Sequence, residues 1–145
     1  MKTRVAWVDT EGNIVAMFAP ENGSLDAPGI EDYNGLTPHW IGPTITMEDH
    51  YWNGTDFVDK PVRPGEYYDW VSAAWALNSD VLMSHIRLGR DIKLQISDWR
   101  VMPDSPLTEE KKAEWVTYRQ ALRDVPANNT GLTHLDDVTW PGEPS

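Results

Sequence analysis

The chain has 145 residues, a formal net charge of −11, eight tryptophans and no cysteine. An acidic surface repels phosphate backbones, so we expect no nucleic-acid partner. The lack of cysteine excludes disulfides and thiolate metal sites and is typical of a reducing cytoplasm. No apolar run reaches the roughly 18 residues that a membrane span needs, so we expect no contact with a membrane.

The first part of the chain has the pattern of β-hairpins. Residues 4–19 contain two apolar runs around Asp9–Asn13, which predicts a hairpin with Gly12 at positive φ. Residues 23–43 are dense in Gly, Pro, Asn and Asp, so we expect mostly loop there.

Two further hairpins are expected before residue 78. Asn53-Gly54 is a strong turn signal between Tyr51-Trp52 and Phe57-Val58. Residues 66–78 favour a third hairpin that turns near Ser72-Ala73. We therefore predict an α+β fold whose residues 1–78 form a small antiparallel β domain, arranged as a β-sandwich.

The pattern changes to helical spacing at Asn78, the first of three residues that favour a helix N-cap. An apolar stripe follows, formed by Val81, His85, Leu88, Ile92 and Trp99, with Leu82, Ile86 and Ile96 beside it. Such wide apolar coverage predicts a helix that is contacted from more than one direction. Gly89 costs about 1 kcal/mol inside a helix, which indicates a need for close packing. Alternation of Ile92, Leu94 and Ile96 is also compatible with a strand, but no turn signal separates these residues from Val81.

A second helix is expected after Pro103 and Pro106. Thr108 is a good N-cap, and Pro126 is expected to end the helix at Val125, which gives a helical hairpin. Four residues are spaced so that they lie on one face of this helix: Trp115, Tyr118, Leu122 and Val125. Arg119 and Arg123 flank that face. These aromatic residues either pack inside the hairpin or face a partner. The two arginines either form a solvated face or pair with Asp98 or Asp124. The tail, with a short strand expected at Asp137–Trp140, completes a second domain at residues 79–145.

The residue pattern offers little for catalysis. His39, His50, His85 and His134 lie far apart, and the chain has no nucleophile elbow and no glycine-rich phosphate loop. We expect no enzyme, metal or cofactor. The tryptophans of the first domain divide into an expected core pair, Trp7 and Trp75, and a partly exposed set, Trp40, Trp52 and Trp70.

One stretch carries a family resemblance. Residues 97–126, "SDWRVMPDSPLTEEKKAEWVTYRQALRDVP", with "VTWPGEPS" behind them, closely resemble the C-terminal region of phage tail fibre assembly chaperones. The motifs that carry the resemblance are Ser97-Asp98-Trp99, Pro103–Leu107, Trp115–Asp124, Pro126 and Trp140-Pro141. The resemblance extends over residues 79–141 and leaves residues 1–60 unmatched.

The resemblance implies a protein that binds the distal, receptor-binding end of a tail fibre and promotes its folding and trimerisation. It implies action in the host cytoplasm during phage assembly, and some members of the family stay on the virion. A homotrimer within a 3:3 complex with the fibre follows from the threefold symmetry of such a client.

Three sets of candidate binding residues follow. The helical module would bind the fibre through Trp99, Trp115, Tyr118, Arg119, Leu122 and Arg123. The β domain would be specific to its client and use Trp40, Tyr51, Trp52 and Trp70. Contacts between copies would involve Val81, His85, Leu88 and Ile92.

Two other classes remain open. A carbohydrate-binding virion protein at the fibre tip would stack Trp40, Trp52 and Trp70 on sugars of the host surface. An unrelated interaction domain would neither assist a fibre nor bind a glycan.

Overall fold

The computed structural model of the chain describes residues 4–20, 33 and 36–145. They form an α+β protein, as predicted, in which short antiparallel strands precede two helices. The chain divides into two compact units, Met1–Ala76 and Leu77–Ser145, here called the β unit and the helical unit. Neither described helix combines the length and the hydropathy needed to cross a membrane.

The β unit is built around a three-stranded sheet with the order β2-β1-β3. Its strands are β1 (Arg4–Val8), β2 (Ile14–Phe18) and β3 (Pro38–Ile41). The central strand β1 is buried on both faces, with Ala6 and Val8 in one apolar cluster and Val5 and Trp7 in another. This explains why its sequence is apolar at nearly every position, since alternation is needed only where one face meets water.

The first hairpin is confirmed, and its loop is fixed by one side chain. Asp9 Oδ1 accepts hydrogen bonds from the backbone N–H groups of Glu11 and Asn13, at 2.9 and 2.8 Å. Gly12 has φ +85°, as expected. A Cβ atom at Gly12 would lie 2.1 Å from the carbonyl oxygen of Trp52, so the loop closely approaches the next hairpin.

The other two hairpins also form where they were predicted. β4 (His50–Trp52) pairs with β5 (Phe57–Asp59), and β6 (Tyr68–Val71) pairs with β7 (Ala74–Leu77). The second of these turns through Ser72 and Ala73, whose φ values are 50° and 60°. Both residues lie in the left-handed region that tight two-residue hairpins require.

One expectation for the β unit needs correction. Pro38–Ile41 was expected in a loop because the residues around it are rich in Pro and Gly. The segment instead forms β3, because β1 provides the hydrogen-bond partners for its backbone. Residues 23–32, 34 and 35 of the expected loop lie outside the described residues. The described strands form three small sheets, and the sandwich arrangement of these strands stays a prediction.

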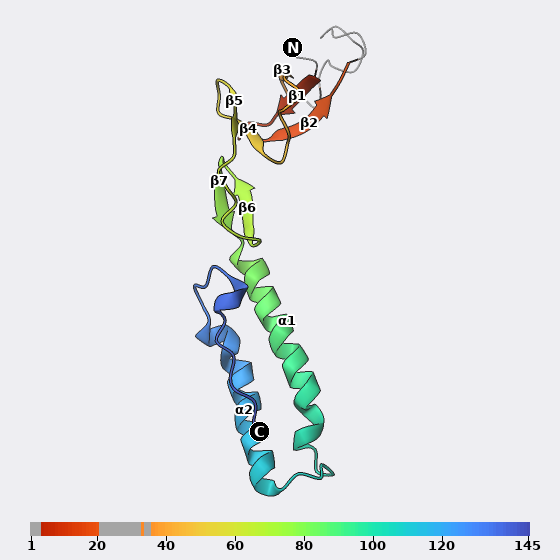
Figure 1. Ribbon diagram of the computed structural model, residues 1–145, viewed down its shortest axis with the longest axis vertical. Coiled ribbons are helices and arrows are strands. Elements are labelled where there is room, and N and C mark those ends of the chain that lie inside the picture. Colours follow the sequence, from red (N-terminus) through yellow and green to blue (C-terminus); the bar gives the residue numbers. More distant parts are fainter. Residues whose placement is uncertain (1–3, 21–32, 34–35) are drawn as a thin grey trace. The chain divides into compact units, whose positions relative to one another are not determined.

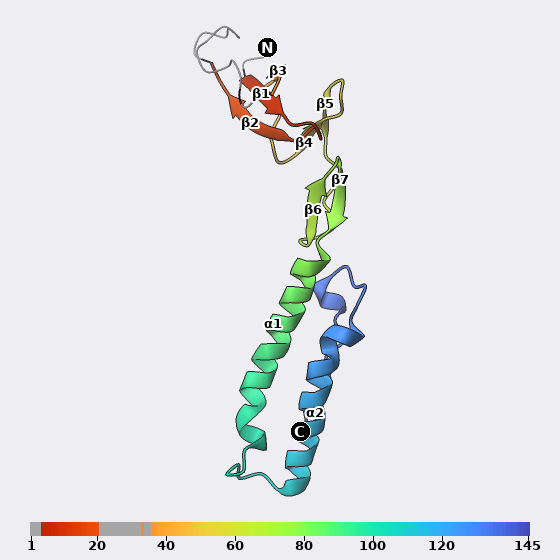
Figure 2. The ribbon, with the colours of Figure 1, turned by 180° about the vertical axis from the view of Figure 1, so that it is seen from behind.

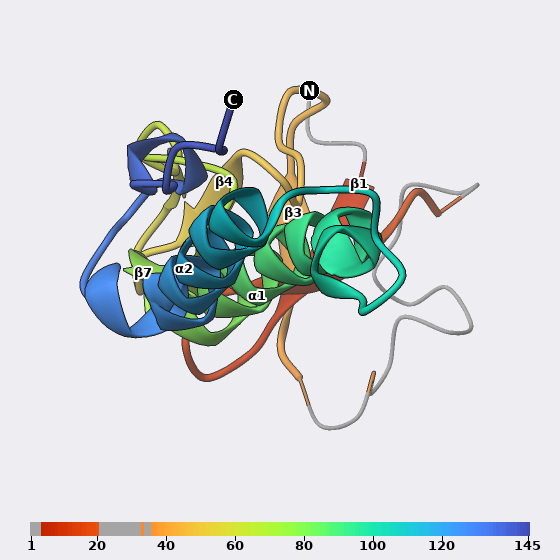
Figure 3. The same cartoon turned by 90° about the horizontal axis from the view of Figure 1, so that it is seen from below.

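The helical unit is an antiparallel hairpin of α1 (Ser79–Ser97) and α2 (Glu109–Asn128), which lie side by side in all three views (Figures 1, 2 and 3). Asn78 caps α1 by accepting from Val81 N, and Thr108 caps α2 by accepting from Lys111 N. The short 3₁₀ helix η1 (Asp98–Val101) follows α1. The alternative of a strand over residues 91–97 is excluded, because α1 is continuous to Ser97.

The end of α2 differs from expectation. The helix passes through Pro126 and continues to Asn128. Proline there lacks the N–H that would donate to the carbonyl of Leu122, so α2 loses one intrahelical bond and continues for only two more residues. The buried Asn129 side chain donates to Val125 O at 2.8 Å and so satisfies a terminal carbonyl.

The tail is extended and does not form the strand expected at Asp137–Trp140. Leu135–Asp137 forms a 3₁₀ turn, η2, and the following residues run without strand pairing. Trp140 packs with the buried aromatic residues of α2, and its ring meets Gly89, where an added Cβ would lie 3.1 Å away. The close packing inferred from Gly89 is therefore present, and its partner is the tail.

Candidate partner-binding surfaces

Helix α1 has an apolar face that its own chain leaves uncovered. Val81, Leu88 and Ile92 are 42%, 57% and 48% exposed, and His85 between them is exposed as well. Trp99, in η1, is 47% exposed. We call Val81, His85, Leu88, Ile92 and Trp99 the outer stripe. The chain buries a different face, through Leu82 and Ile86, so α1 has two apolar faces.

The aromatic face of α2 is packed inside the hairpin. Trp115, Tyr118, Leu122 and Val125 are all nearly inaccessible to solvent. Leu94, Val101, Leu107 and Trp140 pack against this cluster. The sequence left open whether Trp115 and Tyr118 face a partner or the interior, and Leu122 was also assigned to the fibre contact. In the folded hairpin they lie in the interior, and we revise their assignment accordingly.

Arg119 also belongs to the interior. Its side chain donates from Nη1 to Leu94 O at 2.6 Å and to Ser97 Oγ at 2.8 Å, and from Nη2 to Asp98 Oδ1 at 2.5 Å. The residue is only 8% exposed. Arg119 therefore ties α2 to the C-terminal end of α1, and the pairing with Asp98 that the sequence suggested is present. We withdraw it as a direct contact residue.

Two helical candidates remain accessible. Arg123 is exposed, and its one described side-chain bond reaches Gln120 at 3.5 Å. Trp99 is half exposed beside Arg100, whose guanidinium lies 4.9 Å from the Trp99 ring centroid and 4.0 Å from that of Trp115. This arrangement links an exposed aromatic to the buried cluster through a stacked cation.

In the β unit, three aromatic rings form a row. Tyr51 lies 5.0 Å from Trp70, and Trp70 lies 5.1 Å from Trp75. Lys60 and Arg63 lie over the rings of Trp70 and Trp75, at 5.3 and 5.7 Å. Trp75 was expected in a core but is only half-buried, because it lies in this surface row and donates from Nε1 to Pro61 O.

The other aromatic candidates of the β unit lie on the two faces of the three-stranded sheet. Trp52 packs on one face with His39, 4.3 Å between ring centroids, while Trp40 packs on the opposite face near Trp7. Trp7 is buried as predicted, and Trp40, Trp52 and Trp70 are half-buried, as expected of partly exposed residues. The four candidates Trp40, Tyr51, Trp52 and Trp70 therefore do not form one surface.

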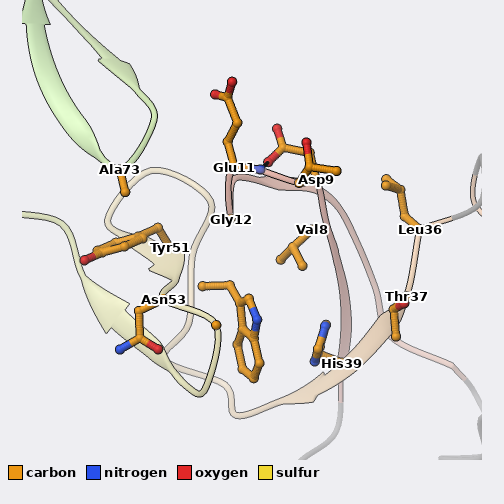
Figure 4. Close-up of a pocket in the computed structure, with 13 residues that line it drawn as sticks. Val8, Asp9, Glu11, Gly12, Leu36, Thr37, His39, Tyr51, Asn53 and Ala73 are labelled. Atoms are coloured by element: carbon orange, nitrogen blue, oxygen red, sulfur yellow. Dashed lines mark hydrogen bonds between the residues drawn. The ribbon is translucent and has the colours of Figure 1, made fainter.

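A hollow of about 640 Å³ opens among the loops of the β unit. We call it the loop hollow. Figure 4 shows Tyr51 and Ala73 at one side, Leu36 and Thr37 at the other, and the β1–β2 loop between them. The full lining is Val8, Asp9, Thr10, Glu11, Gly12, Leu36, Thr37, His39, Tyr51, Trp52, Asn53, Gly54 and Ala73. Sequence reasoning found Tyr51 and Trp52 but missed the hollow, because its walls come from segments far apart in the chain.

The ionisable groups of the loop hollow are shifted in defined directions. Burial would raise the pKa of Asp9, but hydrogen bonds from Asn13, Glu11 and Gly12 outweigh it and lower the pKa below its ordinary value. Burial lowers the pKa of His39, because the charged imidazolium loses hydration. At neutral pH the hollow therefore contains a carboxylate and a neutral imidazole. Within the described ranges, no three His, Asp or Glu side chains are grouped as a metal site would require.

Comparison with known proteins gives one result, and it concerns the helical unit. Residues 83–145 match a family model described as phage tail assembly chaperone protein. The match confirms that the helical unit resembles phage tail assembly chaperones, and the family description names no fibre. It covers fewer than half of the residues and leaves the β unit unmatched. No curated protein and no solved structure matches the chain.

Proposed function

We propose that this protein is an assembly chaperone that binds the distal, receptor-binding part of a phage tail fibre and promotes its folding and trimerisation. The observation that carries the proposal is the family match over residues 83–145. The outer stripe supports it, because an exposed apolar helix face is typical of a surface that another protein covers.

The proposed client has a physical need for such a partner. A trimeric, β-rich fibre tip folds slowly because its contacts are distant in sequence and lie between chains. Until three chains meet, each one exposes unpaired strand edges that favour aggregation. A binding protein that covers such surfaces needs no catalytic group, so we propose a binding role without catalysis. We place this role in the host cytoplasm during assembly, with retention on the virion as a possible later state.

We further propose that the two units have different functions. The helical unit would be the assembly module, and the β unit would recognise one particular fibre. Within α1, Val81 and Leu88 of the outer stripe are seven residues apart, and so are His85 and Ile92. This is the repeat at which helices from several chains pack against one another. Three copies joined along this stripe would match the symmetry of a trimeric fibre in a 3:3 complex.

Co-expression with the tail fibre encoded by the same phage tests the proposal. We expect the unaltered chain to raise the yield of soluble, trimeric fibre, and the mass of the co-purified complex to correspond to three copies of each chain. Absence of any gain in soluble fibre would contradict the chaperone function. One copy per fibre trimer would contradict the stoichiometry alone.

A pair of variants tests the outer stripe. Leu88→Ser combined with Ile92→Ser removes apolar surface that is already exposed, so we expect a normal helical content and a lower fibre yield. Val116→Ser is the matched control, since Val116 is 55% exposed on α2 and lies outside the stripe. Equal fibre yields from the double variant and the control would exclude the stripe as a contact surface.

The carbohydrate-binding alternative has less support. Sugars stack on open aromatic faces, whereas Lys60 and Arg63 lie over the rings of Trp70 and Trp75. Trp40 and Trp52 pack on opposite faces of the sheet and do not form one platform. Binding of the free chain to host glycans, without any effect on fibre solubility, would favour this alternative.

A further inference from the structure

We infer that the loop hollow is a recognition site for a cationic side chain, lysine or arginine, presented by a segment of the client protein. The identity of the client rests on the proposed function, whereas the chemistry of the site rests on the β unit alone. The family match does not extend to this unit. The loop hollow therefore lies in a part of the chain that the comparisons leave unassigned.

The hollow is built by loops that are held in place. Trp52 N donates to Gly12 O at 2.8 Å, which joins the β1–β2 loop to β4. In the β4–β5 loop, Asn53 Oδ1 accepts from the backbone N–H groups of Thr55 and Asp56, both at 2.9 Å. Its volume of about 640 Å³ lies within the roughly 300–1,000 Å³ typical of ligand pockets. A site fixed before binding loses little conformational entropy when it is occupied.

The charged side chains that line the hollow are all acidic. Its lining includes the carboxylates of Asp9 and Glu11 and contains neither lysine nor arginine. The described cations of the β unit, Arg4, Lys60 and Arg63, donate to backbone carbonyls elsewhere. Their acceptors are Gly42, Pro43 and Ile45 for Arg4, Met47 for Lys60, and Glu66 and Tyr68 for Arg63. The two carboxylates therefore have no cationic side chain beside them in the lining, which favours a cationic ligand and disfavours an acidic segment.

The aromatic part of the lining favours the same occupant. Tyr51 packs beside Trp70 and Trp52 beside His39, and both rings stay half-buried in the wall, so part of each ring can still attract an ammonium or guanidinium group. His39 adds no competing positive charge at neutral pH, because burial lowers its pKa. Glu11 is exposed, and its Oε2 has a single long bond to Ser72 N, at 3.4 Å. It can therefore turn towards a bound cation without breaking a strong contact.

A pair of short peptides tests the inference on the full chain. The probes are acetyl-Gly-Arg-Gly-amide and its citrulline counterpart, which keeps the shape of the arginine side chain but carries no charge. We expect the arginine peptide to shift the amide NMR signals of Gly12, Asn53 and Gly54, and the citrulline peptide to bind three- to tenfold more weakly. Equal binding of the two peptides, or shifts outside the loop hollow, would overturn the inference.

Isosteric variants test whether the arginine peptide binds because of the carboxylate in the hollow or because of the net negative charge of the chain. Glu11→Gln should weaken binding of the arginine peptide three- to tenfold. Glu66→Gln, which removes the same charge at an exposed position outside the hollow, should leave binding within twofold. Equal losses from the two variants would show that binding follows net charge, and that result would refute a specific site.

Co-expression with the fibre distinguishes a failure of the recognition site from a failure of the chaperone function. If the unaltered chain yields soluble trimeric fibre and Glu11→Gln yields the same amount, the recognition site is wrong and the chaperone function stands. If the unaltered chain has no effect on the fibre but the arginine peptide binds in the hollow as described, the chaperone function fails and the site stands.

Discussion

Replacing Arg119 by methionine should destabilise the helical hairpin while preserving most of its packing. Methionine keeps a long flexible stem but loses every donor of the guanidinium group. In the structure those donors reach Leu94 O, Ser97 Oγ and Asp98 Oδ1. The substitution therefore removes the polar connection between α2 and the end of α1.

The magnitude follows from the three bonds taken separately. Hydrogen bonds that involve a charged group contribute about 1.5–3 kcal/mol each when they are shielded from water. The bond to Ser97 is buried, and the bond to Leu94 is partly buried. The carboxyl partner Asp98 is 57% exposed, so its ion pair should contribute only about 0–1 kcal/mol. Because Ser97 Oγ keeps its own bond to Lys93 O, we expect a net loss of about 2–4 kcal/mol.

Urea denaturation followed by circular dichroism at the helical band measures this loss. Arg123→Met is the matched control, because Arg123 is exposed and its described bond to Gln120 is 3.5 Å long. We expect the control to stay within about 0.5 kcal/mol of the unaltered chain. If Arg119→Met lowers the free energy of unfolding by as little as Arg123→Met does, Arg119 does not stabilise the hairpin. Its assignment to an interface would then be restored.

Three further predictions concern packing, backbone conformation and pH. Leu122→Ala should destabilise the helical unit by about 2–5 kcal/mol, since Leu122 is fully buried; a loss below about 1 kcal/mol in the same urea assay would contradict its place in the core. Gly12→Ala should destabilise the β unit far more than Gly54→Ala, as measured by thermal melts. Both positions have positive φ, but only at Gly12 would the new Cβ meet a backbone atom, the Trp52 oxygen at 2.1 Å. Comparable losses at the two glycines would show that the close approach is relieved at little cost. The lowered pKa of His39 means that the unfolded chain takes up a proton before the folded chain does, so stability should fall as the pH drops below the ordinary value of 6.5 and level off below the folded-state pKa. His39→Gln should flatten this part of a stability-versus-pH curve, and an unchanged curve would exclude His39 as its cause.

Much of the local structure follows from short sequence patterns. Asn53-Gly54 and the run around Gly12 determine their turns, because few residues adopt positive φ without strain. Asn78 and Thr108 determine where the helices begin, because their side chains satisfy backbone donors that a helix start leaves free. The motif around Trp115 led to the same family as the match over residues 83–145.

Other features depend on contacts that no short pattern contains. Pro38–Ile41 becomes a strand only because β1 lies beside it, and α2 continues past Pro126 with the help of the buried Asn129. The loop hollow exists because four separate segments converge, which a local pattern does not encode.

The sequence by itself determined the order of hairpins and helices, the caps and turns, the acidic charge and the family resemblance of the helical part. The caps and turns depend on residues within a few positions of one another. Only the tertiary structure decided which side of α1 is buried, since the outer stripe and the inner face of α1 are both apolar. It placed Arg119 in the interior and left the outer stripe uncovered, because α2 and the tail together fill one face of α1 and not the other.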